Sequence, residues 1–147
     1  MLAKYVYEVG LIYRGFVIIS HEFRELPMQK AQTNEQKDLR GAFISAISIF
    51  AKTAFHNNAL EYLESGNISF IFKLTKVKSK EGRLPEPLIM YGLTEKKKKN
   101  NEKFVKRFLI KVEPILETFT QKFTNKDFTD LSIFEPFEAE LSDYFNH

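Results

Sequence analysis

The side chains most able to do chemistry, histidines and carboxylates, are spaced too irregularly to predict a catalytic or metal site. The three histidines, His21, His56 and His147, lie far apart, and none has a second ligand at a spacing familiar from metal sites. The acidic groups around Glu61 and Glu135 are of the kind that surface helices and turns carry routinely. We therefore expect no metal, no cofactor and no catalytic role.

Cysteine and glycine, which could supply nucleophiles and phosphate-binding loops, add no further site. The chain has no cysteine, which excludes disulfides and thiolate ligands and fits a reducing compartment. Its 6 glycines are scattered singly, without the pattern of a nucleotide-binding loop. Apolar runs such as residues 16–19 are far shorter than the roughly 20 residues of a membrane-spanning helix. We expect a soluble, cytoplasmic protein without a secretory leader, whose function is binding.

The charges are sorted along the chain. The formal net charge is +3, yet residues 76–107 hold 11 basic and 4 acidic residues, a net of +7, and residues 127–147 contain six acids and no Lys or Arg. A lysine run in the basic part could neutralise the phosphates of nucleic acid or of an anionic membrane. This run consists of Lys96, Lys97, Lys98 and Lys99. Because an expected strand separates it from the lysines of residues 76–83, the two clusters should lie at opposite ends of a sheet, and a solvated loop is the simpler interpretation.

Hydrophobic periodicity predicts a sheet followed by two helices, with a further helix inserted between its strands. Alternating or β-branched segments predict strands, and apolar residues at three- and four-residue steps predict helices. At 147 residues with 44% hydrophobic content, the chain fits one domain, residues 1–147, with one core. The expected strands lie at residues 4–12, 16–23, 60–64, 68–75 and 88–94, and the expected helices at 34–55, 104–123 and 136–145.

The strands also indicate how many layers the domain has. Residues 16–19 and 88–91 are apolar on both faces, as expected when helices cover both sides of a sheet. Residues 76–87 contain glycine and prolines among charges and should form a solvated loop. Pro114 should kink or split the helix at 104–123, since proline lacks a backbone amide. The expected fold class is α/β or α+β, a three-layer α-β-α sandwich around a five-stranded, mostly antiparallel sheet with the element order ββαβββαα.

This order of elements in about 140 residues resembles the longin domain, the profilin-like module of vesicle-trafficking proteins, adaptor small subunits and related archaeal proteins. The resemblance covers the whole chain and rests on element order, length and helix pattern, because longins have no invariant catalytic motif. It implies a non-catalytic scaffold for small-GTPase regulation or membrane trafficking. Such a scaffold would pair with a second copy, with another longin or roadblock protein, with a small GTPase or with an extended peptide. Peripheral membrane contact also fits, and nucleic acid fits less well.

Two surfaces are candidates for partner binding. The longin arrangement puts the second strand, residues 16–23, at a sheet edge, where free amides and carbonyls can accept another strand. The helix at 34–55 carries more apolar residues than one sheet contact requires. The candidate partner-binding residues are Phe16, Ile18, Ser20, Ile44, Ser48, Ile49 and Phe55. Two alternatives stay open: a basic-loop protein that binds nucleic acid or anionic membranes through the lysine run, and an enzyme or ligand sensor with an unrecognised pocket.

Overall fold

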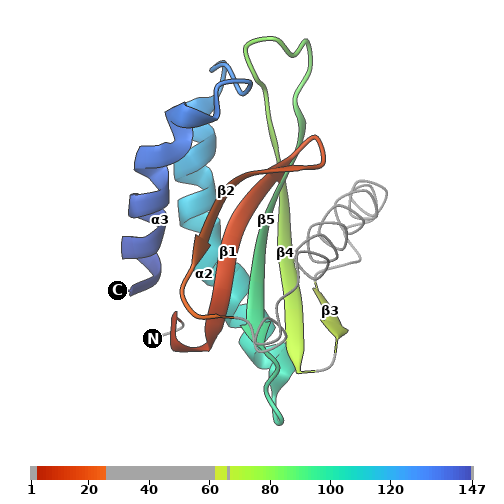
Figure 1. The fold of residues 1–147 in the computed structure, drawn as a ribbon. Helices are drawn as coiled ribbons and strands as arrows, with labels where there is room; N and C mark the ends of the chain where they lie inside the picture. The colour runs from red at the N-terminus through yellow and green to blue at the C-terminus, as the bar shows by residue number, and fades with distance from the viewer. Residues whose placement is uncertain (1–2, 26–61, 66, 147) are drawn as a thin grey trace, which may run out of the picture.

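A twisted antiparallel sheet and two C-terminal helices form the framework of the protein (Figure 1). The computed structural model describes residues 3–25, 62–65 and 67–146. The strands are β1 (Val6–Tyr13), β2 (Phe16–Glu22), β3 (Tyr62–Ser65), β4 (Ile68–Val77) and β5 (Glu86–Glu95). The helical elements are the 3-10 helix η1 (Ala3–Tyr5), the helix α2 (Asn101–Phe123), the 3-10 helix η3 (Leu131–Phe134) and the helix α3 (Glu135–Asn146).

The sheet has the strand order β2-β1-β5-β4-β3. Each neighbouring pair is antiparallel, and β4 and β5 pair along their full length of ten residues. The sequence predicts a five-stranded sheet. The structure instead has four long strands, and the fifth element, β3, contributes only four residues beside β4. The fold class is therefore α+β, with the N-terminal strand β1 inside the sheet.

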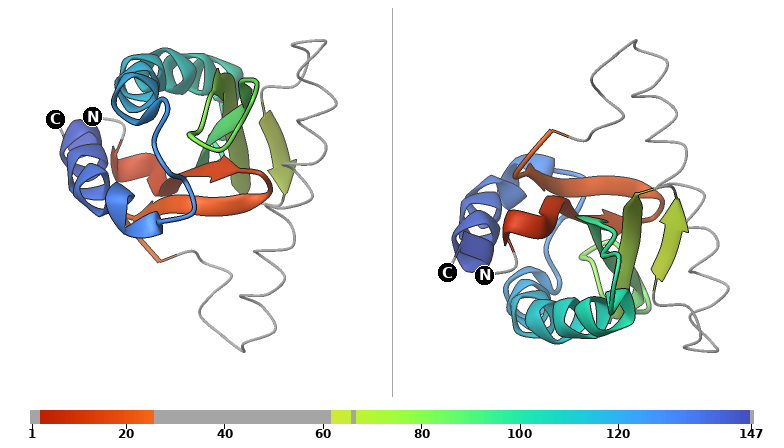
Figure 2. Two further views of the ribbon diagram at one scale, coloured as in Figure 1. Left: turned by 90° about the horizontal axis from the view of Figure 1, so that it is seen from above. Right: turned by 90° about the horizontal axis from the view of Figure 1, so that it is seen from below.

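Both described helices lie on one face of the sheet (Figure 2). α2 packs over β4, and α3 packs over β2. One buried cluster joins the helices to the strands, because apolar residues recur along α2 and α3 at helical spacing. Phe119 of α2 is fully buried at its centre, with ring centroids of four other phenylalanines at 4.6 to 6.2 Å. These rings belong to Phe123, Phe128, Phe134 and Phe137, so they hold η3 and the start of α3 in place.

α2 approaches the sheet closely at Gly92 of β5. A Cβ atom at this position would lie 2.3 Å from Cζ of Phe108, the α2 side chain that covers it. The helix is continuous through Pro114, so the predicted split does not occur. Pro114 is exposed, and the carbonyl that loses its helical partner belongs to Ile110, which is 72% exposed. Water can hydrate this carbonyl, which lowers the cost of the missing hydrogen bond.

The other face of the sheet carries a second buried cluster, made of strand residues. The expectation that residues 88–91 are buried on both faces is confirmed, because Leu88 and Met90 join the helical cluster while Ile89 and Tyr91 join the second one. The predicted third layer, the helix at residues 34–55, lies outside the described residues.

Three connections meet at one end of the sheet, which we call the loop end. They are the turn between β1 and β2, the β4–β5 loop (residues 78–85) and the α2–η3 connection (residues 124–130). Figure 1 shows the β4–β5 loop projecting at the top of the molecule, beside the α2–η3 connection.

Long-range hydrogen bonds anchor the loop end. The Tyr13 hydroxyl donates a hydrogen bond to Oγ of Ser79 (3.1 Å), which is fully buried. The amide of Lys80 donates to the carbonyl of Lys126 (2.8 Å), and the amide of Asn125 donates to the carbonyl of residue 78 (2.7 Å). β4 extends to Val77 and β5 begins at Glu86, so the solvated loop predicted at residues 76–87 is shorter than expected. The hydrogen bonds to residues far away in the sequence also dock part of this loop on the rest of the molecule.

Candidate interaction site at the sheet edge

β2 forms an edge of the sheet, as the sequence analysis predicts. It pairs with β1, which is itself paired on its other side with β5. The outer backbone groups of an edge strand can accept a strand from another protein. Of the candidate residues on β2, Phe16 (74% exposed) and Ser20 are exposed, whereas Ile18 is buried. Ile18 packs in the helical cluster and also borders the groove described below, so its contact with a partner stays a prediction.

A β-bulge explains why the apolar run on β2 is split between core and surface. The register pairs Leu11 with Ile19 but Ile12 with Val17, so Ile18 is the extra residue. As a result, the consecutive residues Ile18 and Ile19 both enter the helical cluster. Phe16 and Val17, which precede the bulge, remain 74% and 39% exposed. The sequence interpretation that both faces of this run are covered is therefore wrong.

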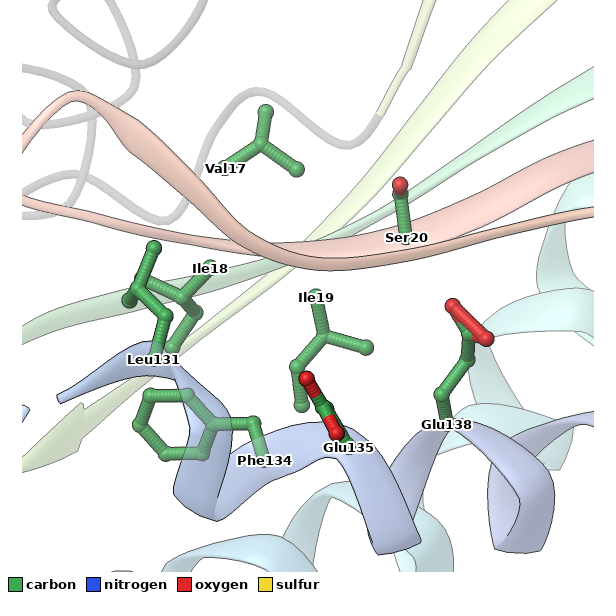
Figure 3. A pocket seen from close by; sticks show the side chains of 8 residues that line it. All are labelled: Val17, Ile18, Ile19, Ser20, Leu131, Phe134, Glu135 and Glu138. Atoms are coloured by element: carbon green, nitrogen blue, oxygen red, sulfur yellow. The ribbon is translucent and has the colours of Figure 1, made fainter.

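A groove of about 230 Å³ runs between β2 and the helical layer (Figure 3). β2 forms one wall, and η3 with the first turn of α3 forms the other. Its apolar surface includes Leu131, which is 50% exposed, and the buried ring of Phe134. The lining residues are Val17, Ile18, Ile19, Ser20, Leu131, Phe134, Glu135 and Glu138.

The charge of the groove is acidic. Glu135 and Glu138 lie in the first turn of α3 and are exposed, and no Lys or Arg is among the described residues that line the groove. Carboxylates are favoured at this position because the amino end of a helix carries partial positive charge. An extended segment with apolar side chains and a lysine or arginine would complement both the groove and its rim.

The other predicted partner surface belongs to the helix expected at residues 34–55. Ile44, Ser48, Ile49 and Phe55 lie outside the described residues. The groove residues of η3 and α3 were not among the predicted site residues. Pro136, in the first turn of α3, predicts where that helix begins, but the position of its first turn against β2 depends on packing in the helical cluster.

The lysine run lies at the end of the sheet opposite the loop end, as predicted. Two of its four lysines contact other residues of the chain. Nζ of Lys96 lies 3.0 Å from a carboxylate oxygen of Glu64, and this contact lowers the pKa of Glu64. Nζ of Lys97 lies 3.5 Å from the centre of the Tyr5 ring, and this nearby ammonium lowers the pKa of the Tyr5 hydroxyl. Lys98 and Lys99 are exposed. These contacts weaken the prediction that the whole run binds phosphates.

Asn101, which the sequence analysis did not single out, organises this end. Its Oδ1 accepts a hydrogen bond from the amide of Lys97 (3.0 Å), and its Nδ2 donates to Glu64 (3.0 Å) and to Ser69 (3.1 Å). The adjoining hollow of about 470 Å³ mixes carboxylates with lysines. Such a surface has no single sign of charge that would select one ligand.

A buried carboxylate on the second sheet face was also missed. Glu8 of β1 is 3% exposed, and its Oε2 accepts a hydrogen bond from the Tyr91 hydroxyl (2.5 Å). Gly10 makes room for this arrangement, because a Cβ atom there would lie 2.5 Å from the Tyr91 hydroxyl. The sequence shows Glu8 only as a polar position in a strand.

The remaining chemistry-bearing residues do not converge. Within residues 3–25, 62–65 and 67–146, no three His, Asp or Glu side chains gather as metal ligands would. His21 makes an edge-on contact with Phe23, while His56 and His147 lie outside the described residues.

In the described part of the chain, no helix has the length and apolar character needed to span a membrane. Comparisons with protein-family models, with curated proteins and with solved structures find no match.

Proposed function

We propose that this chain is a longin-like, non-catalytic interaction module that binds a protein partner along the free side of β2. The observation that carries the proposal is the edge position of β2 beside a groove with an apolar lining and an acidic rim. Backbone pairing at such an edge supplies affinity, and side-chain pockets next to it supply selectivity.

The bulge in β2 limits where pairing can occur. Ile19, Ser20, His21 and Glu22 pair with β1 in continuous register, so their outer backbone groups form the regular part of the edge. The bulge lies before them and twists the strand, which is a common way to restrict edge-to-edge association. A partner strand is therefore expected along residues 19–22, with Phe16 and Val17 as apolar contacts beside it.

The resemblance to longins suggests the kind of partner. The strand order and the two C-terminal helices on one face support the resemblance, as does the position of β2. The proposed partners are a second copy of the chain, another longin or roadblock protein, or a small GTPase. A role in GTPase regulation or membrane trafficking, in the cytoplasm, is the corresponding proposal.

Light scattering combined with hydrogen exchange tests this proposal. We expect the chain to form a dimer, or a complex with a purified longin, roadblock or GTPase protein from the same source, in which the amides of residues 19–22 exchange more slowly. The variant Ser20→Lys places a charge on the edge and should weaken the complex. Gln121→Lys adds the same charge at an exposed position of α2 and should leave the complex intact.

Two results would contradict the proposal. One is a strict monomer that binds no member of the panel. The other is a complex in which the exchange of residues 19–22 is unchanged and Ser20→Lys binds as well as Gln121→Lys.

A further inference from the structure

Exposed apolar side chains gather at the loop end. Among the described residues, five large hydrophobic side chains are exposed, and four of them belong to the start of β2, the β4–β5 loop or the start of η3. They are Phe16 (74%), Val17 (39%), Leu84 (74%) and Leu131 (50%). The fifth, Ile110, lies on α2.

Polar contacts hold these side chains near one another. The guanidinium of Arg14 makes two hydrogen bonds to the carboxylate of Glu86, at 2.6 and 2.7 Å. Arg14 lies two residues before Phe16, and Glu86 lies two residues after Leu84. Leu131 and Val17 line the same groove. The four apolar side chains therefore occupy one end of the molecule, although they come from β2, the β4–β5 loop and η3.

The β4–β5 loop at this end is basic, unlike the acidic groove beside it. The β4–β5 loop contains Lys78, Lys80 and Arg83 with a single acid, Glu81. The Lys78 ammonium is bonded to a neutral amide, that of Asn125 (3.2 Å). Lys80 and Arg83 are exposed, and neither takes part in an ion pair within the described part of the chain. Their charge is available to an anionic surface.

We propose that the loop end docks on an anionic lipid bilayer, with Leu84 and Phe16 entering the acyl boundary and the β4–β5 loop cations facing the headgroups. Apolar side chains on projecting loops gain from burial in lipid, and cations around them attract acidic headgroups. Nucleic acid would use the cations, but an aliphatic side chain such as Leu84 adds nothing to phosphate binding. This inference goes beyond the proposed protein-binding role and does not rest on it.

Flotation of the full chain with vesicles tests the docking. We expect binding to vesicles of phosphatidylcholine with phosphatidylserine, weak binding to phosphatidylcholine alone, and a loss of binding as salt increases. Leu84→Ser should weaken binding about tenfold or more, because it removes an apolar side chain from the acyl boundary. Ile110→Ser is the matched control, since Ile110 is equally exposed (72%) but lies on α2.

A second pair of variants tests the charges. The double variant Lys80→Ser/Arg83→Ser should weaken binding about fivefold for each charge removed. Lys98→Ser/Lys99→Ser removes two exposed charges from the opposite end and should leave binding unchanged. The proposal is overturned if the chain ignores anionic vesicles, or if it binds duplex DNA instead. Equal effects of Leu84→Ser and Ile110→Ser on vesicle binding would also overturn it. So would equal effects of the two double variants, Lys80→Ser/Arg83→Ser and Lys98→Ser/Lys99→Ser.

Discussion

The contact between Gly92 and Phe108 makes a sharp prediction about stability. In the variant Gly92→Ala, the added Cβ would lie 2.3 Å from Cζ of Phe108 and 2.9 and 3.0 Å from two further ring atoms. The Phe108 ring is 1% exposed and stacks on Phe145 of α3 at 5.8 Å, so it has no open space to enter. Either α2 moves away from β5 or the ring leaves its preferred position.

The magnitude follows from two opposing effects. Overpacking a filled core costs about 1–3 kcal/mol. Replacing glycine by alanine also lowers the entropy of the unfolded chain, which stabilises the protein by about 0.4–1 kcal/mol. The net loss for Gly92→Ala should therefore be about 1–2 kcal/mol, or a decrease in melting temperature of roughly 2–8 °C for a domain of this size.

Urea unfolding followed by circular dichroism provides the assay. Gly82→Ala is the control, because a Cβ at Gly82 meets only Oγ of Ser79 at 3.0 Å and two backbone atoms beyond 3.5 Å. A double variant with Phe108→Leu, which shortens the ring, should recover about 1 kcal/mol relative to the sum of the single effects. If Gly92→Ala is as stable as Gly82→Ala, or if the two changes at residues 92 and 108 are additive, the packing argument is refuted.

Three further predictions concern the end of the sheet opposite the loop end. The Thr94 hydroxyl is buried and has no hydrogen-bond partner within the described residues, so Thr94→Val should stabilise the protein by about 1 kcal/mol in urea unfolding; a loss of stability would contradict this. Asn101→Ala removes three hydrogen bonds and should destabilise by about 1–3 kcal/mol, measured against the exposed control Asn146→Ala. Because the Lys96 ammonium lowers the pKa of Glu64 in the folded state, this pair stabilises the protein above the ordinary glutamate pKa and less as pH falls through the lowered value. The stability difference between wild type and Glu64→Gln should therefore shrink on acidification, and a pH-independent difference would exclude the linkage.

The elements predicted best are those specified by local residues. The strands expected at residues 4–12 and 16–23 are joined by a tight turn, and Gly15 in this turn has the positive φ of 81° that glycine adopts at little cost. The apolar spacing of residues 104–123 predicts α2 to within one turn. The helix begins three residues earlier because Asn101 is held by Glu64 and Ser69, which lie in other elements.

The features that sequence could not provide depend on contacts between distant segments. The apolar run at residues 16–19 contains no sign of a bulge, because the register shift depends on pairing with Leu11 and Ile12. In the sequence, Gly92 looks like an ordinary glycine within a strand, because its close contact with Phe108 depends on how α2 packs on β5. The groove was missed for the same reason: its two walls, β2 and η3 with α3, are more than a hundred residues apart in the chain.

The interior position of β1 has a consequence for synthesis on the ribosome. β1 leaves the ribosome well before its second neighbour, β5, which begins at Glu86 and pairs with it from Val6↔Thr94 to Tyr13↔Leu88. Until β5 has been synthesised, the hairpin of β1 and β2 has two unpaired strand edges and uncovered apolar side chains. Such a hairpin is prone to self-association. Pairing across so many residues also implies a high contact order and slow folding for a chain of this size.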